Sequence, residues 1–77
     1  MNYYKAKLIN RKSIIDRETS KPYIRCQTEE EFCETVNKEM DELRNKGARN
    51  ISVQYFEAQT EICRAIITYM TVSYTHL

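Results

Sequence analysis

The sequence predicts a small α+β protein in which an antiparallel sheet of three to four strands packs on one α-helix, in the order β-β-α-β-β. Three observations indicate this fold class. A central segment has apolar residues at helical spacing, two segments on each side of it have β-forming composition, and polar or glycine-containing turns separate them. A helix with one apolar stripe needs a surface to cover, and a sheet supplies that surface.

The helix is predicted over residues 29–46. Thr28 followed three residues later by Glu31 forms a capping box, and Gly47 provides the left-handed stop at the other end. Acidic residues crowd the first turn, where the helix dipole favours them. The apolar stripe has the spacing i, i+4, i+8, i+11 and consists of Phe32, Val36, Met40 and Leu43.

Two strands are predicted after the helix, over residues 50–57 and 61–71, joined as a hairpin by a turn at residues 58–60. The first strand alternates Ile51, Val53 and Tyr55 with polar residues. The second strand has apolar residues on both faces: Cys63, Ala65, Ile67 and Tyr69 on one, Ile62, Ile66 and Met70 on the other. A strand of this kind is either a buried central strand or part of a subunit interface.

Two further strands are predicted before the helix, over residues 3–10 and 22–27, with a polar turn at residues 16–21 between them. The first alternates Tyr4, Ala6 and Leu8 with Tyr3, Lys5 and Lys7. Pro22 has no N–H to donate to a neighbouring strand, which predicts a place at the start of an edge strand.

The last six residues, Val-Ser-Tyr-Thr-His-Leu, match the translation of a transposase mosaic-end adapter used in sequencing libraries. We therefore expect a single domain over residues 1–71 and an adapter-derived tail at residues 72–77, the alternative being a genuine final strand. His76 is the only histidine. An adapter origin would leave the domain without the most frequent general base and metal ligand.

The size of the chain limits its stability and suggests self-association. A core built from 77 residues supplies only about 3–5 kcal/mol unless a disulfide, a metal or an oligomer adds to it. Cys26, Cys33 and Cys63 are odd in number and lack zinc-site spacing, so we expect them to be buried thiols and expect a homo-oligomer with no cofactor or metal. No signal-peptide or membrane-spanning pattern occurs, which predicts a cytoplasmic protein without membrane attachment.

Charge is distributed unevenly although the formal net charge is only +1. Basic residues dominate the first 28 positions and acidic residues the next 20. Basic and aromatic side chains in the first part could hold phosphates and stack on a base, and the alternative is a solvated sheet edge defended by lysines. The candidate ligand-binding residues are Arg11, Lys12, Lys21 and Arg25 for phosphates and Tyr23 for stacking. A near-neutral chain with an acidic helix makes polymeric nucleic acid an unfavourable ligand.

No reacting set of side chains is evident, so we expect a protein that is not an enzyme and has no catalytic residues. A cysteine nucleophile would lack a histidine base, and the glutamates at the start of the helix are what capping and the helix dipole select. Gly47 is the only glycine, so no glycine-rich phosphate loop exists.

Residues 28–70 resemble the small Spore Cse-type sporulation and phage proteins. The likeness lies in the acidic amphipathic helix, then Asn-Ile-Ser-Val-Gln-Tyr at residues 50–55 and Ala-Ile-Ile-Thr-Tyr at residues 65–69. That family supplies no catalytic residues.

In size and basic-aromatic composition the chain is also similar to phage anti-defence sponges, which trap the nucleotide messengers of bacterial immunity. We therefore expect a phage- or mobile-element-encoded protein that sequesters a small anionic ligand such as a cyclic or ADP-ribose-type nucleotide. The alternative is a protein-interaction adaptor or sporulation-type structural protein.

Overall fold

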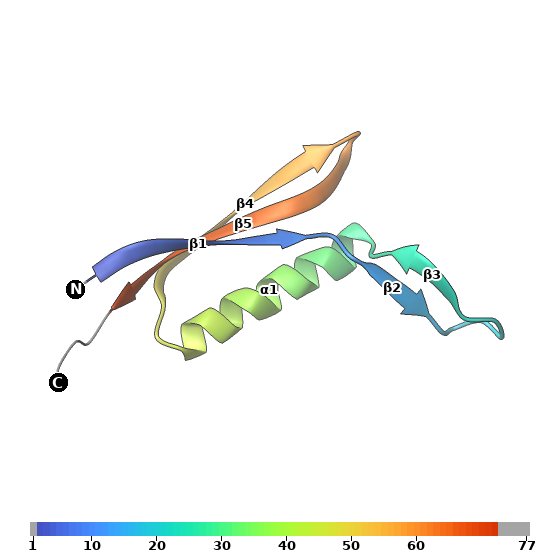
Figure 1. The fold of residues 1–77 in the computed structure, drawn as a ribbon, viewed down its shortest axis with the longest axis horizontal. Helices are drawn as coiled ribbons and strands as arrows, with labels where there is room; N and C mark the ends of the chain where they lie inside the picture. Colours follow the sequence, from blue (N-terminus) through green and yellow to red (C-terminus); the bar gives the residue numbers. More distant parts are fainter. Residues whose placement is uncertain (1, 73–77) are drawn as a thin grey trace.

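The structure is a computed structural model that describes residues 2–72, without the side chains of residues 2, 3 and 72 (Figure 1). The elements in chain order are β1 (Asn2–Asn10), β2 (Ser13–Asp16), β3 (Tyr23–Cys26), α1 (Glu29–Asn45), β4 (Arg49–Ala58) and β5 (Glu61–Val72). The α+β class is confirmed. The predicted order β-β-α-β-β is wrong by one strand, because the segment after β1 pairs with β3 as a separate short strand.

The strands form two antiparallel sheets. The larger has the order β1-β5-β4, and the smaller consists of β2 and β3 alone. β5 is therefore the central strand, as its two apolar faces predicted. The β1–β5 register is continuous from Asn2 opposite Val72 to Asn10 opposite Arg64, and residues directly opposite each other share a face. The larger sheet thus has one face toward α1 and one face away from it.

The predicted helix signals are all present. The Thr28 hydroxyl accepts a hydrogen bond from the Glu31 N–H, and the Glu31 carboxylate accepts one from the Thr28 N–H. At the other end Gly47 has φ +93°, its N–H donates to the Arg44 carbonyl, and the Ala48 N–H donates to the Leu43 carbonyl. These two bonds form a Schellman motif that satisfies the last carbonyls and turns the chain toward β4.

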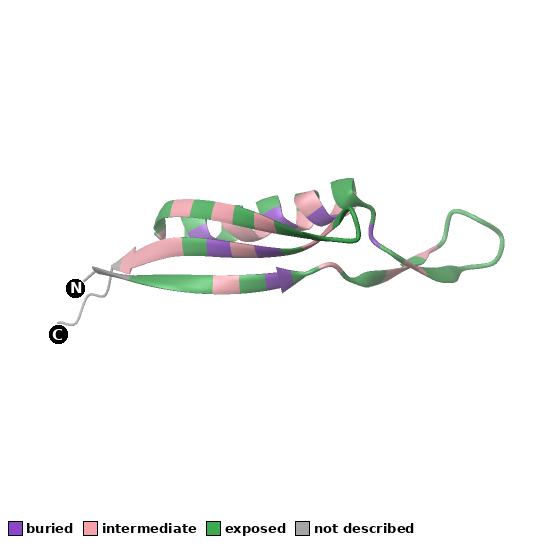
Figure 2. Cartoon of the chain, turned by 90° about the horizontal axis from the view of Figure 1, so that it is seen from above, coloured by how far each residue is buried: buried purple, intermediate pink, exposed green. Residues whose placement is uncertain are grey.

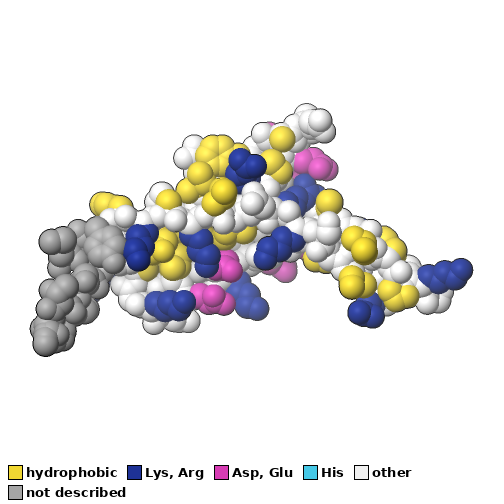
Figure 3. Space-filling model, in the orientation of Figure 1, with side chains coloured by type: hydrophobic (Ala, Val, Ile, Leu, Met, Phe, Trp, Pro, Cys, Tyr) yellow, Lys and Arg dark blue, Asp and Glu magenta, His cyan; other side chains and the backbone are white. Residues whose placement is uncertain are grey.

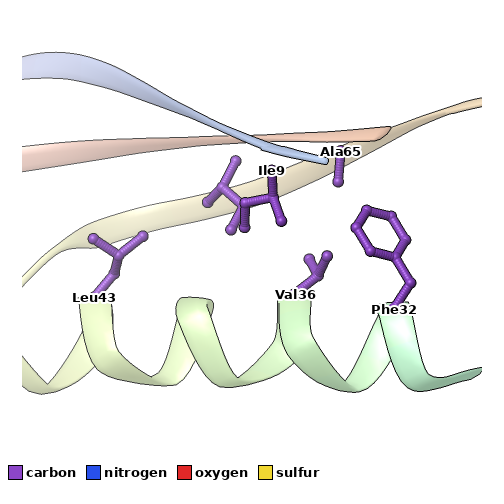
Figure 4. Close-up of a cluster of buried hydrophobic side chains, with 6 residues drawn as sticks. Ile9, Phe32, Val36, Leu43 and Ala65 are labelled. Atoms are coloured by element: carbon purple, nitrogen blue, oxygen red, sulfur yellow. The ribbon is translucent and has the colours of Figure 1, made fainter. Parts of the chain in front are cut away.

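The core lies between α1 and the larger sheet (Figure 4). Phe32 and Val36 from the helix and Ala65 and Ile67 from β5 are fully buried. Ile9 and Leu43 complete the buried cluster, and the predicted stripe residue Met40 is half-buried beside it. A core of only six buried side chains, with Phe32 the single aromatic one, is small, as expected for a chain of this length.

One predicted face assignment is wrong. Ile62 was placed on the face of β5 opposite Ala65, yet it packs against the core cluster. The β4–β5 register shifts between Phe56 and Glu57, so that Arg64 is opposite Phe56 while Ile62 is opposite Glu57. The extra residue at Cys63 forms a β-bulge. The bulge shifts the alternation by one residue, so the side chain of Ile62, just before it, lies on the other face.

β2 and β3 form an arm that extends from the body (Figure 1). The molecule measures 56 × 27 × 14 Å with a radius of gyration of 16.0 Å, whereas a compact domain of this length has about 11.5 Å. Nearly all of the arm is exposed in Figure 2, including Ile15, Ile24 and Cys26. The expectation of a buried thiol is therefore wrong for Cys26, because no other layer covers the arm, and Cys33 and Cys63 are only partly buried.

Most of the predicted tail, residues 73–77, lies outside the described residues, and the prediction of its origin stays untested. Within residues 2–72, α1 is too short and too polar to cross a bilayer.

The β4–β5 turn should be a weak point of the fold. Its two central residues, Gln59 and Thr60, have φ values of 53° and 69°. Such a two-residue turn favours Asn-Gly, and a β-branched residue at positive φ is strained by about 1–3 kcal/mol. Replacing the pair by Asn-Gly should raise the free energy of unfolding by about 1 kcal/mol, after the extra freedom of glycine in the unfolded chain is subtracted. Urea denaturation measures this change.

The matched control is Thr60→Val, which keeps the branched side chain and should give no gain. If the Asn-Gly variant unfolded at a lower urea concentration than the parent chain, the left-handed turn would be refuted.

Candidate anion-binding cleft

A cleft of about 650 Å³ opens where β1 passes the C-terminal end of α1. Half of the residues that line it are basic. They come from β1, from the end of the helix and from the start of β4, and Figure 3 shows lysine and arginine side chains gathered in this part of the surface. The lining consists of Lys5, Lys7, Leu43, Arg44, Lys46, Gly47, Ala48, Arg49, Tyr69 and Thr71.

The fold brings these residues together by two local rules. Alternation along β1 places Lys5 and Lys7 on the helix side of the sheet, because they share the face of buried Ile9. α1 packs mainly over β5 and β4, so the helix leaves the first half of β1 uncovered (Figure 2). The Schellman motif turns the chain after α1, so that Lys46 and Arg49 lie in the same cleft as Lys5 and Lys7.

At least two of the five cations, Lys7 and Arg44, are partly neutralised by acids on the helix. The Lys7 Nζ donates to Glu39, and this hydrogen bond raises the pKa of Lys7 and lowers that of Glu39. Arg44 lies 2.6 Å from the Asp41 carboxylate in an exposed pair. In the part of the chain that the structure describes, Lys46 and Arg49 make no ion pair. The cleft therefore keeps an excess of positive charge.

Hydroxyl groups complete the set of donors. Thr71 Oγ1 is buried and, among the described residues, has no hydrogen-bond partner. A buried hydroxyl left unpaired costs free energy that a bound acceptor would recover. Tyr69 adds a half-buried ring to the same wall of the cleft. Ammonium, guanidinium and hydroxyl groups around one opening form a set of donors suited to a phosphate or carboxylate.

The size of the cleft agrees with a small molecule. Its volume falls within the range of about 300–1,000 Å³ that is typical of small-molecule sites. Within residues 2–72, no three His, Cys, Asp or Glu side chains are grouped as metal ligands would be. The arrangement can bind and orient an anion through direct contacts.

Two of the five residues predicted to bind the ligand, Arg11 and Arg25, are engaged in ion pairs within the protein. The Arg11 guanidinium donates to the Gln27 and Ile62 carbonyls and to Glu61, and its side chain is only 15% exposed. Arg25 Nε lies 2.7 Å from Asp16, and its two terminal nitrogens donate to Glu31 at 2.7 and 2.9 Å. These contacts fasten the arm to the body.

The other three predicted residues are exposed but dispersed. Lys12 lies at the base of the arm, Lys21 in its turn and Tyr23 on β3, where its hydroxyl donates to Asp16 over 3.3 Å. None of these three, nor Arg25, lines the basic cleft or the smaller cleft of about 440 Å³ beside Arg11. Whether they bind a ligand stays a prediction.

The sequence alone did not predict the basic cleft, because its residues lie in three separate segments, 5–7, 43–49 and 69–71. Two local signals were available, namely the alternation that sets Lys5 and Lys7 on one face and the basic residues around Gly47. Joining these signals requires the β1–β5 register and the position of the helix.

Comparison of the chain with protein-family models, with curated proteins and with solved structures gives no match. The functional argument therefore depends on the residues of this chain alone.

The contacts of Arg25 predict an acid-sensitive junction between the arm and the helix. Its hydrogen bonds lower the pKa of Glu31 from 4.5 to about 2, with a smaller contribution from the Thr28 N–H, and lower the pKa of Asp16. A carboxylate with a lowered pKa in the folded state stabilises that state above its unfolded pKa and loses this effect as the pH falls.

The melting temperature should therefore fall as the pH decreases from 4.5 to about 2, and Arg25→Gln should make this fall shallower. Differential scanning fluorimetry over this window measures it. Arg44→Gln, which removes an exposed pair, should leave the slope of the parent chain unchanged. Parallel slopes for Arg25→Gln and the parent chain would contradict the proposed junction.

Proposed function

We propose that the protein is a non-catalytic binding module that captures a small anionic ligand in the cleft between β1 and the end of α1. The observation that carries the proposal is the gathering of five cations, a tyrosine and an unpaired buried threonine hydroxyl around one opening. The ligand we favour is a nucleotide, such as a cyclic or ADP-ribose-type signal of bacterial immunity.

The charges favour a compact anion over a polymer. Lys46 and Arg49 are available to phosphates, while Glu39 and Asp41 lie one or two helical turns away. A long nucleic acid would run from the cleft onto the acidic helix surface and be repelled there. A ligand confined to the cleft contacts the cations and avoids most of that repulsion.

The mixed lining favours a nucleotide over a simple ion. Lys46 is a flexible point charge and Arg49 a planar fork, and both types bind phosphate oxygens. The ring of Tyr69 offers a face to a base, and Thr71 Oγ1 offers a hydrogen bond to a sugar or phosphate oxygen. A free phosphate would fill only a small part of a 650 Å³ cleft.

The second candidate function is a protein-interaction adaptor, and the arm is the observation that favours it. Ile24 is 75% exposed and lies opposite Ile15, which is 55% exposed. An isolated two-stranded hairpin with exposed apolar residues is only marginally stable in water. An adaptor would use these residues to dock on another protein.

Calorimetric titration with cyclic dinucleotides, ADP-ribose and inorganic pyrophosphate tests the proposed ligand class. The double variant Lys46→Glu/Arg49→Glu should weaken binding of the best nucleotide by about 100-fold or more, because two attractions become repulsions in a confined site. Neither residue makes an ion pair in the described chain, so the thermal stability of this variant should stay close to that of the parent.

The matched control is Lys21→Glu/Lys12→Glu, which makes the same charge change at two positions of the sequence-predicted site. It should leave affinity within about threefold, since exposed charges a long way from the ligand are screened by salt. Loss of binding in this control alone would move the site to the arm. No heat with any of the probes would refute capture of a nucleotide.

A further inference from the structure

We infer that the face of the larger sheet turned away from α1, here called the open face, is covered by the same face of a second copy of this chain. This inference is independent of the cleft, which lies on the helix side. The alternation that directs Lys5, Lys7 and Ile9 toward the helix directs Tyr4, Ala6 and Leu8 to the open face. β1 therefore presents its apolar side to the outside of the molecule.

Apolar side chains dominate the open face along β1, alternate with polar ones along β5, and include Phe56 on β4. Tyr4 is 69% exposed, Leu8 54% and Phe56 37%, and Ile66 and Met70 lie between the two outer strands. Contiguous exposed apolar surface of this kind is rare on soluble monomers and marks an interaction site. The face lies opposite the helix, so no element of the described chain covers it.

Four polar side chains of this face form two pairs, and Gln54 is an exposed polar residue beside them. Ser52 Oγ lies 2.7 Å from Thr68 Oγ1 across the β4–β5 ladder, and Arg64 Nε donates to Asn10 Oδ1 over 3.1 Å. Polar groups with partners can be buried at little cost, whereas unpaired ones cannot. Among residues 4–10 of β1, 64–70 of β5 and 52–56 of β4, Arg64 is the single charged residue on this face, and Arg49, opposite Met70, lies beyond the β4 bulge at its edge.

A second copy is the occupant that agrees with the dimensions of the molecule. Strands of nine residues at about 3.3 Å per residue, three abreast at about 4.8 Å, give a footprint of roughly 30 × 14 Å. This projection of roughly 420 Å² is about half of the roughly 800 Å² per partner of a standard interface, so the open face agrees with a weak dimer that forms at high protein concentration. The body is only two layers thick, and a second copy would turn it into a four-layer α/β/β/α particle with a sheet-on-sheet core.

The position of Arg64 selects one arrangement of the two copies. Arg64 lies at one end of the face, and Tyr4 opposite Met70 lies at the other. A two-fold axis running along the strands would bring the two Arg64 side chains together. A two-fold axis across the strands places each Arg64 over Tyr4 of the partner subunit, where a cation–π contact is favourable. The two arms then extend from opposite ends of the dimer.

Size-exclusion chromatography with light scattering, over a wide range of protein concentrations, tests the inference. The parent chain should have twice the monomer mass at high protein concentration. Leu8→Lys should raise the dimer dissociation constant by about 100-fold or more, because a two-fold axis makes each substitution count twice. Leu8 is exposed on an edge strand, so circular dichroism should show that this variant stays folded.

Ile24→Lys is the matched control, since it introduces the same charge at an exposed apolar position of the arm. It should stay dimeric. The inference is overturned if the parent chain is a monomer at all concentrations, or if Ile24→Lys dissociates while Leu8→Lys remains a dimer, which would show that the arms join the copies.

Discussion

The packing of one helix over one face of a three-stranded sheet is the contact on which the rest of this structure depends. Phe32 and Val36 of α1 and Ala65 and Ile67 of β5 are fully buried, and Figure 4 shows the helix side chains directed toward the sheet. Burial of each of these side chains stabilises the folded state by about 1.5–3 kcal/mol, and burial of the smaller Ala65 by less. The helix covers β5 and β4 more than β1. The uncovered parts of the larger sheet form the cleft and the open face.

Two surfaces are produced by this partial cover. On the helix side, the first half of β1 has no layer above it, and a cleft forms between its lysines and the basic end of α1. On the far side, the whole sheet is open and carries Tyr4, Leu8 and Phe56. Charged residues are concentrated around the first surface and nearly absent from the second. This separation is why we assign a small anion to the cleft and an apolar partner to the open face.

The arm adds a third element whose attachment is electrostatic. Arg25 of β3 forms ion pairs with Asp16 of β2 and with Glu31 of the helix. Glu31 therefore caps the helix N-terminus and also anchors the β2–β3 hairpin. In the sequence, its charge and the nearby Tyr23 predict that Arg25 binds a phosphate. In the fold its three guanidinium donors are directed at two carboxylates and the Cys26 carbonyl. A basic residue in a sequence does not reveal which acid it will meet.

The sequence by itself determined the elements whose signals are local. The capping box at Thr28, the left-handed stop at Gly47 and the central place of β5 depend on residues within a few positions of one another, so they could be predicted. The tertiary structure alone decided the bulge at Cys63 that turns Ile62 inward, the separation of the β2–β3 arm, and the meeting of Lys5 with Lys46. These features depend on strand register and on the direction in which a helix crosses a sheet. Both are set by contacts between residues far apart in the chain, which local spacing does not encode.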